Sequence, residues 1–192
     1  METEESPTNW RIVLIKIPAE PSRHRVAVWR ELRKVGALSI GQGVWAVPNV
    51  PVFAVGIDKA TALVERAGGE IIFLDAVGAT AADGARFEAM FTTAREDDWA
   101  EFLSDCTKYE AELDKEIRIR KFTLAELEEE DQSLDRLRRW HRDLKARDVF
   151  GASNSEQATA ALQHCTQRFE DYSARVIAAL HDPAPSDESD RT

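Results

Sequence analysis

The order of strand-like and helix-like segments in residues 10–77 limits this chain to very few folds. The first segment, WRIVLIKI, is rich in β-branched residues and stops before Pro18, which has no N–H group to continue a sheet ladder. Two later strand-like segments flank Gly41-Gln42-Gly43, which is typical of a hairpin turn because glycine accepts positive φ. The six segments are expected at 10–17, 22–36, 37–40, 44–48, 57–67 and 70–77. Their order, β-α-β-β-α-β, predicts an α+β fold of the ferredoxin-like type, in which two helices cover one face of an antiparallel sheet.

The first helical segment combines apolar and basic side chains. The apolar stripe expected to face the sheet consists of Val26, Trp29, Leu32 and Val35, with Val28 on its flank. The basic residues are Arg23, Arg25, Arg30, Arg33 and Lys34. A guanidinium group can hold a tetrahedral oxyanion or a phosphate through two parallel hydrogen bonds, which lysine cannot match. The alternative is a half-exposed helix whose arginines pair with some of the 35 acidic residues.

The region after residue 78 predicts three long helices. Apolar residues recur at helical spacing in each of them, as in Phe102, Cys106, Tyr109 and Leu113, in Leu127, Leu134, Leu137, His141 and Leu144, and in Ala158, Leu162, Cys165, Phe169, Tyr172, Val176 and Ala179. Thr123 with Glu126, and Ser153 with Glu156, each fit a capping box at a helix start. We therefore expect an antiparallel helical bundle. The expected domains are a ferredoxin-like domain at 9–78, a bundle at 84–181 and a polar, disordered tail at 182–192.

The overall charge restricts the partners of the chain. Its 192 residues carry a formal net charge of −10, which argues against a protein that coats nucleic acid indiscriminately. A local basic site remains compatible with this charge, because screening limits exposed charges to a reach of roughly 10 Å. The sequence contains neither a secretory signal nor an apolar run long enough to cross a bilayer. We expect a cytoplasmic protein without a membrane partner.

A second basic cluster lies in the middle helix of the predicted bundle. Arg138, Arg142 and Lys145 share one flank of this helix, as contact with a nucleic-acid backbone or an anion would require. The segment before them is acidic, so the charge order also suits the helix dipole without any ligand. A solvated face and a binding face are both compatible with this pattern.

The sequence offers little for covalent or metal chemistry. Its four histidines and two cysteines lack zinc-ligand spacing, and there is no phosphate loop, dinucleotide fingerprint or nucleophile elbow. We predict no catalytic residues, no metal and no cofactor, and hence no enzyme. Cys106 and Cys165 lie on the apolar stripes of their helices and are expected to be inert core residues, with oxidant sensing as the alternative.

The opening stretch resembles a known family. Its shared features include Trp10, Ile17-Pro18, Pro21-Ser22, Arg25, Val28-Trp29-Arg30, Leu32, Gly36-Ala37 and GVWAVP at 43–48. With AGGE at 67–70 and the arginine-bearing helical part, the likeness to the N-terminal domain of ChrB, the chromate-resistance regulatory protein, covers roughly residues 10–150. The same skeleton is more distantly similar to the central domain of PaaX-type repressors.

The resemblance implies a chromate-responsive regulator of transcription. Its expected partners are operator DNA, chromate as the effector and a second copy of the chain. We place the oxyanion site at Arg25, Trp29 and Arg30, and DNA contacts at Arg23, Arg33, Lys34, Arg138, Arg142 and Lys145. Arg138 and Arg142 are the candidates for a second wall of the oxyanion site.

Two alternatives to this function follow from the same sequence. The first is an interaction module that dimerises without binding DNA, because the winged helix of PaaX-type repressors and the second domain of longer ChrB proteins are not evident. The second is a metal nuclease of the small ferredoxin-like kind, which would need a carboxylate at the end of the first strand. That strand ends in Lys16-Ile17-Pro18, so the nuclease is the weaker alternative.

Overall fold

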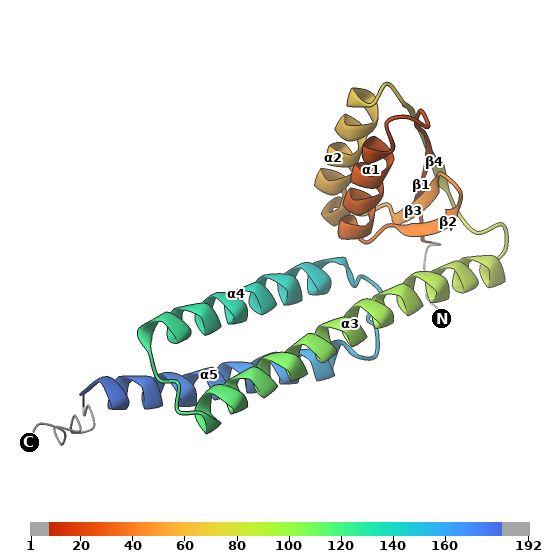
Figure 1. Ribbon diagram of the computed structural model, residues 1–192. Helices are drawn as coiled ribbons and strands as arrows, with labels where there is room; N and C mark the ends of the chain where they lie inside the picture. The colour runs from red at the N-terminus through yellow and green to blue at the C-terminus, as the bar shows by residue number, and fades with distance from the viewer. Residues whose placement is uncertain (1–7, 182–192) are drawn as a thin grey trace, which may run out of the picture. The chain divides into compact units, whose positions relative to one another are not determined.

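The structure, a computed structural model, describes residues 8–181 and shows an α+β protein that is mostly helical (Figure 1). Its elements are β1 (Trp10–Lys16), α1 (Ser22–Val35), β2 (Leu38–Gly41), β3 (Val44–Pro48), the 3₁₀ turn η1 (Pro51–Phe53), α2 (Ala54–Arg66), β4 (Glu70–Ala76), α3 (Ala81–Arg118), α4 (Leu124–Arg147) and α5 (Ser155–His181). The α+β class predicted from the sequence is confirmed. The tail predicted to be disordered, 182–192, lies outside the described residues.

The four strands form one antiparallel sheet with the order β2-β3-β1-β4. In its centre, Val13 of β1 is opposite Trp45 of β3 on one side and Phe73 of β4 on the other. The second helix starts at Ala54, three residues earlier than expected, because the turn η1 leads directly into it. The predicted order of strands and helices is therefore found, with one boundary shifted.

Helix α1 begins after Pro21 and ends at Gly36, whose φ of 85° is left-handed and therefore suits glycine. The predicted apolar stripe of this helix is confirmed only in part: Leu32 is buried and Val35 packs against the core, as expected. Val28 and Leu32 are buried, whereas Val26 and Trp29 are 43 % and 54 % exposed. The side of α1 that carries Val28 and Leu32 packs into the core of the sheet unit, and this leaves Val26 and Trp29 exposed.

Helices α1 and α2 cover one face of the sheet (Figure 1). Between them and the strands lies an apolar core in which Val13, Leu32, Ala60 and Val64 are fully buried. Burial of each large aliphatic side chain contributes about 1.5–3 kcal/mol to folding, so this core holds α1 firmly on the sheet.

The opposite face of the sheet is covered only at one end. There, Trp10 packs edge-on against Phe87 and Phe91 of α3, with ring centroids 4.5 and 5.6 Å apart. Farther along the same face, Ile72 and Leu74 of β4 are 58 % and 53 % exposed. An apolar strip of the sheet therefore faces solvent.

The chain divides into two compact units. The described residues 8–95 and 146–152 form what we call the sheet unit, and residues 96–145 and 153–181 form the helical unit. The division falls inside α3 rather than in the loop before residue 84. The reason is that Phe91, on the first turns of α3, belongs to the core of the sheet unit.

Within the helical unit, α3 runs antiparallel to α4 and parallel to α5. Trp99 contacts His141, and Tyr109, farther along α3, contacts the earlier residue Glu130 of α4. The two helices therefore run in opposite directions. Conversely, the pairs Glu110–His164 and Asp114–Arg168 advance by four residues on both helices. The predicted stripes are largely confirmed, since their buried members include Phe102, Cys106, Tyr109, Leu113, Leu134, Leu137, Leu144, Ala158, Cys165, Tyr172 and Val176.

The two predicted capping boxes differ in outcome. The hydroxyl of Thr123 accepts a hydrogen bond from the backbone N–H of Glu126 at 3.3 Å, as expected. The second box is wrong, because α5 begins only at Ser155. The Ser153 hydroxyl instead donates to a carboxylate oxygen of Glu96 on α3 at 2.8 Å.

Candidate functional site

A groove of about 340 Å³ in the sheet unit brings together two of the three residues predicted to bind an oxyanion. We call it the α1 groove. It is lined by Ile15, Lys16, Ile17, Arg25, Val28, Trp29, Leu32, Gln42, Gly43 and Trp45. Arg25 and Trp29 stand on its α1 side, and both are exposed. Sequence reasoning missed Lys16 and Gln42, which join the groove through the register of β1 and the β2–β3 turn.

The β2–β3 turn is held close to β1. The backbone N–H of Ile15 donates to the carbonyl oxygen of Gly43 at 2.7 Å. A Cβ at residue 43 would lie 2.6 Å from the carbonyl oxygen of Ile15, and its φ of 72° is left-handed, so glycine is required there. This tight turn places the Gln42 amide in the same groove as Arg25 and Lys16.

Arg30 does not line the α1 groove. Five residues of an α-helix correspond to about 500° of rotation, so Arg30 points roughly 140° away from Arg25. It lies instead on the outward side of α1, where Arg23, Arg33 and Lys34 are also exposed. The guanidinium carbon of Arg33 is 5.9 Å from the ring centre of Trp29. Arg25 and Arg30 thus occupy different surfaces of one helix.

The positive charge of α1 is not neutralised locally. Across residues 8–181, none of the five basic side chains of α1 makes an ion pair, and the first turn of the helix contains no acidic residue. The described part of the sheet unit holds twelve arginines and lysines against nine aspartates and glutamates, a net charge of plus three. Among the described residues, no acidic side chain pairs with the arginines of α1, as the alternative would require.

The end of α1 is bound by two arginines that sequence reasoning did not single out. Arg95 donates to the carbonyl oxygen of Gly36 at 2.6 Å, and Arg147 donates to that of Lys34, also at 2.6 Å. The Arg95 guanidinium is 4.6 Å from the ring centre of Phe91, four residues earlier on α3. Cations suit the negative end of a helix, so both residues help to fix the position of α1. For Arg95, the sequence does contain a signal: a phenylalanine four residues earlier on the same helix, against which a guanidinium can pack.

The predicted basic residues of α4 are in a different situation. Arg138 donates to a carboxylate oxygen of Asp135 at 3.1 Å, Lys145 donates to the hydroxyl of Ser155 at 3.1 Å, and Arg142 is exposed. All three belong to the helical unit. The second wall that Arg138 and Arg142 would add to the oxyanion site stays a prediction.

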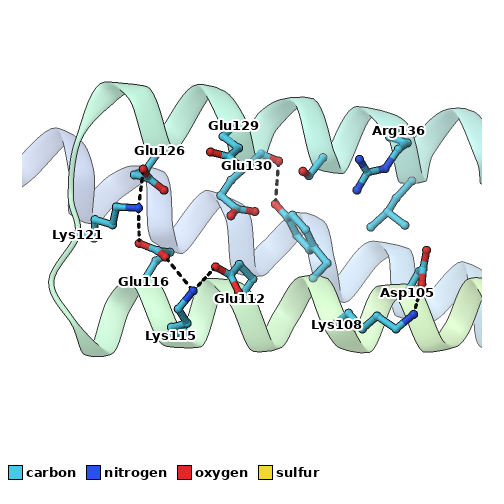
Figure 2. Close-up of a pocket in the computed structure, with 13 residues that line it drawn as sticks. Asp105, Lys108, Glu112, Lys115, Glu116, Lys121, Glu126, Glu129, Glu130 and Arg136 are labelled. Carbon is cyan, nitrogen blue, oxygen red and sulfur yellow. Dashed lines mark hydrogen bonds and ion pairs between the residues drawn. The ribbon is translucent and has the colours of Figure 1, made fainter.

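A second pocket, also of about 340 Å³, lies between α3 and α4 (Figure 2). We call it the acidic pocket. Its lining residues are Asp105, Lys108, Tyr109, Glu112, Lys115, Glu116, Lys121, Glu126, Glu129, Glu130, Ser133, Arg136 and Leu137. Six carboxylates thus face four basic groups, a balance that disfavours an anionic ligand.

Two glutamates of the acidic pocket are unusually buried. Glu116 is 2 % exposed and lies near Lys115 and Lys121, at 3.7 and 3.9 Å. Glu130 is 5 % exposed, and burial, followed by the repulsion of Glu112 and other carboxylates, raises its pKa to about 7. Sequence reasoning missed both, although each continues an apolar stripe at a position where a carboxylate is out of place.

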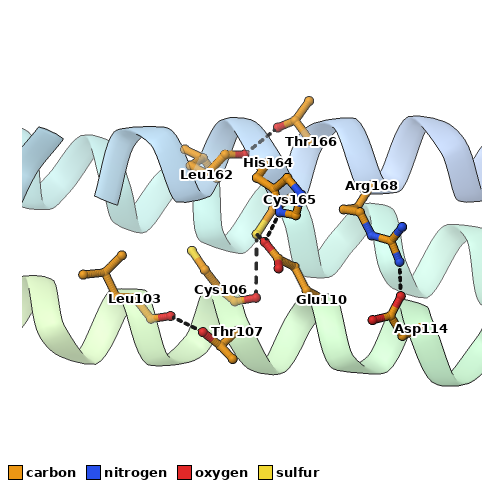
Figure 3. A network of polar contacts seen from close by, with 10 residues as sticks. All are labelled: Leu103, Cys106, Thr107, Glu110, Asp114, Leu162, His164, Cys165, Thr166 and Arg168. Carbon is orange, nitrogen blue, oxygen red and sulfur yellow. Dashed lines mark hydrogen bonds and ion pairs between the residues drawn. The ribbon is translucent and has the colours of Figure 1, made fainter. Parts of the chain in front are cut away.

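The helical unit also brings its two cysteines together (Figure 3). The Cys165 thiol lies 3.7 Å from the carbonyl oxygen of Cys106 and 3.6 Å from a carboxylate oxygen of Glu110. Both cysteines are buried and free. Their predicted burial is confirmed, and their contact was not foreseen.

Two further features concern possible ligands and membranes. Among residues 8–181, no group of three or more histidine, cysteine or acidic side chains is arranged to hold a metal ion. None of the helices in this part of the chain has the length and apolar character needed to span a membrane.

The comparison with known families agrees with the resemblance seen in the sequence. The family described as "Protein ChrB, N-terminal" matches residues 25–183, and no curated protein matches the chain. The match begins on α1 and continues past residue 150 along α5, farther than the likeness noted from the sequence. The chain therefore belongs to the family of the N-terminal part of protein ChrB, which places it among regulators related to chromate resistance.

Proposed function

We propose that this chain is a chromate-linked regulator of transcription and that its α1 groove binds the oxyanion. The observation that carries the proposal is the un-neutralised charge of α1, part of which lines a groove beside Trp29. Chromate is a tetrahedral dianion, and an arginine fork with a second cation suits this shape and charge.

Each polar group in the groove has a role in this proposal. Arg25 donates two parallel hydrogen bonds to two oxygens of the anion, and Lys16 supplies a point charge from the end of β1. Gln42 donates from its side-chain amide, and the Trp29 ring limits the space beside Arg25. Lys16 lies 3.7 Å from Glu70, but both side chains are largely exposed, so this ion pair competes weakly with a ligand. Arg30, placed in the site from the sequence, has no part in it.

The outward side of α1 is the proposed DNA contact. Arg23, Arg30 and Lys34 are spaced by seven and four residues and therefore lie on one side of the helix, with Arg33 beside them. Phosphate contacts need exposed cations and give strongly salt-dependent binding. In this proposal, an anion held on one flank of α1 alters the affinity of its neighbouring side for DNA. Arg138, Arg142 and Lys145 are weaker candidates, because two of them already have partners within the helical unit.

The remaining parts of the proposal concern fold type and assembly. The strand order supports assigning the sheet to the ferredoxin-like type. The role is one of binding, without catalytic residues or a cofactor, in the cytoplasm. The exposed strip at Ile72 and Leu74 supports a homodimer formed through the sheet. Dimerisation alone, without DNA binding, is the second candidate function, and the same strip favours it.

Calorimetric titration of sulfate and chromate tests the oxyanion site. Sulfate has the same shape and charge as chromate without its oxidising power. Arg25→Ala is expected to weaken binding ten- to a hundredfold, since a charge-assisted hydrogen bond contributes about 1.5–3 kcal/mol. Arg25→Lys should be nearly as harmful, because lysine keeps the charge and loses the fork.

Arg30→Ala is the matched control, as it removes the same charge from the same helix outside the groove. It should bind sulfate within about twofold of the parent, the residual effect of one screened charge. Equal losses in both variants would show a diffuse charge effect and no site. Unchanged binding in Arg25→Ala would place the site elsewhere.

A further inference from the structure

The contact between Cys106 and Cys165 has a chemical consequence independent of the α1 groove. The two residues are 59 positions apart in sequence, on helices that run parallel, and each is buried within the helical unit. The Cys165 sulfur lies against the backbone of Cys106, so the two side chains start from neighbouring positions on α3 and α5 (Figure 3). A disulfide needs Cα atoms within about 7 Å of each other, a spacing that neighbouring positions on packed helices can reach.

The surroundings of the pair distinguish its two sulfurs. The hydrogen bond from the Cys165 thiol lowers the pKa of Cys106, against the opposing effect of burial. The pKa of Cys165 is raised by that same hydrogen bond, by burial and by the nearby Glu110 carboxylate. A thiolate is the nucleophile in thiol chemistry, so Cys106 is the first sulfur to react.

Two polar side chains next to the pair reach the surface. Glu110 lies on α3 one turn after Cys106, and His164 lies on α5 beside Cys165. The His164 ring nitrogen and a Glu110 carboxylate oxygen are 2.7 Å apart, and the His164 side chain is largely exposed. Movement of these two side chains is the route by which a small neutral oxidant would reach the pair.

We propose that Cys106 and Cys165 form a reversible disulfide when the protein meets a peroxide. The Cys106 thiolate attacks one peroxide oxygen, the O–O bond breaks, and the departing oxygen takes a proton and leaves as water. Cys106 is then a sulfenic acid. The Cys165 sulfur attacks the Cys106 sulfur, the S–S bond forms and the S–O bond breaks, and the departing hydroxide takes the Cys165 thiol proton and leaves as a second water. The dithiol has lost two electrons, and hydrogen peroxide has been reduced to two waters.

The product would tie α3 covalently to α5. This gives the helical unit an oxidised and a reduced form, whereas the proposed anion site lies in the sheet unit. The modification thus goes beyond the proposed function, and either can fail while the other stands.

Intact mass and thiol counting on the whole chain test this proposal. The reduced protein is treated with hydrogen peroxide, quenched and measured by mass spectrometry and by thiol titration in denaturant. The expected product has lost both thiols together and two hydrogen atoms in mass, runs as a single chain on a non-reducing gel, and regains both thiols with dithiothreitol. Proteolysis should yield a peptide linking residues 106 and 165.

Two variants keep the test decisive. In Cys165→Ser, the mass loss should be absent and Cys106 should be trapped as a sulfenic acid by dimedone. Arg25→Ala should form the disulfide as the parent does, because it alters only the groove. Oxygen addition without disulfide, disulfide-linked dimers, or thiols that stay unreacted while free cysteine is consumed would each overturn the proposal.

Discussion

The two units of this chain manage charge in opposite ways. In the described residues, the sheet unit has a net charge of plus three, whereas the helical unit carries nineteen acidic against twelve basic residues, a net charge of minus seven. Basic residues of the helical unit often pair with carboxylates, as Lys121 does with Glu126 at 2.6 Å. Within residues 8–181, the basic residues of α1 have no such partners. An acidic chain can therefore present a basic surface, provided that the two kinds of charge are kept in separate parts of the fold.

Ion pairs and buried apolar side chains contribute differently to the stability of the helical unit. Exposed ion pairs contribute about 0–1 kcal/mol each, so the many pairs of the helical unit do not account for its stability. The buried apolar side chains between its helices account for that stability. Core packing and ion pairing can therefore be tested by separate substitutions.

Phe102→Ala is expected to have the largest effect on stability. Phe102 is fully buried and packs against Trp99 and Trp140, with ring centroids 6.0 and 5.4 Å away. Its truncation should lower the free energy of unfolding by about 3–5 kcal/mol, measured by chemical denaturation. Lys108→Ala, which breaks the exposed pair with Asp105, is the control and should cost less than about 1 kcal/mol. Comparable losses would mean that ion pairs, rather than the core, hold this unit together.

Glu130→Gln tests the buried charge of the acidic pocket. The pKa of Glu130 is raised to about 7, so the folded state prefers its protonated form. This contribution to stability is fully present below the ordinary glutamate pKa and is lost as the pH rises to about 7. The variant should therefore be more stable than the parent at pH 8, by about 1–3 kcal/mol.

The advantage of Glu130→Gln should disappear near pH 4. Burial lowers the pKa of His141, which changes stability in the opposite direction with pH, so the difference between parent and variant is the quantity to follow. Unfolding free energies measured across this pH range provide it. A constant difference would show that Glu130 titrates at its ordinary pKa.

Leu74→Glu tests whether the open face of the sheet forms a dimer. Leu74 is 53 % exposed, and a carboxylate on both copies would repel across a two-fold interface. We expect dimerisation to weaken at least about tenfold, or 1.4 kcal/mol, by light scattering. Val55→Glu on α2, where Val55 is 64 % exposed, is the control. A parent mass near 21.6 kDa at micromolar concentration would contradict the dimer itself.

Much of the fold could be predicted from local patterns. The order of strands and helices in the sheet unit follows from residue types that act over a few positions, such as Pro18 and the glycines of the turn. The long stripes of the last three helices were equally informative, because a repeat of three and four residues sustained over many turns has few interpretations. The error in α1 arose where two apolar series overlap and only the sheet decides which of them is buried.

The candidate sites were harder to predict, because they depend on register and helix rotation. Arg25 and Arg30 look equivalent in sequence, yet rotation about α1 places only Arg25 in the groove. Lys16 joins it through strand pairing. The contact of Cys106 with Cys165 likewise depends on the parallel alignment of α3 and α5, which no local pattern contains.

Binding to operator DNA is the decisive test of the claim that the un-neutralised charge of α1 is the surface for anionic ligands. The measurement compares Arg30→Ala/Lys34→Ala on α1 with Arg138→Ala/Arg142→Ala on α4, using fluorescence anisotropy on the protein's own upstream region at several salt concentrations. We predict that the α1 variant binds at least about tenfold more weakly and that its salt slope falls by roughly two, as expected for two lost phosphate contacts. The α4 variant should match the parent in affinity and slope. A loss confined to the α4 variant, or no binding by the parent at low salt, would contradict the claim.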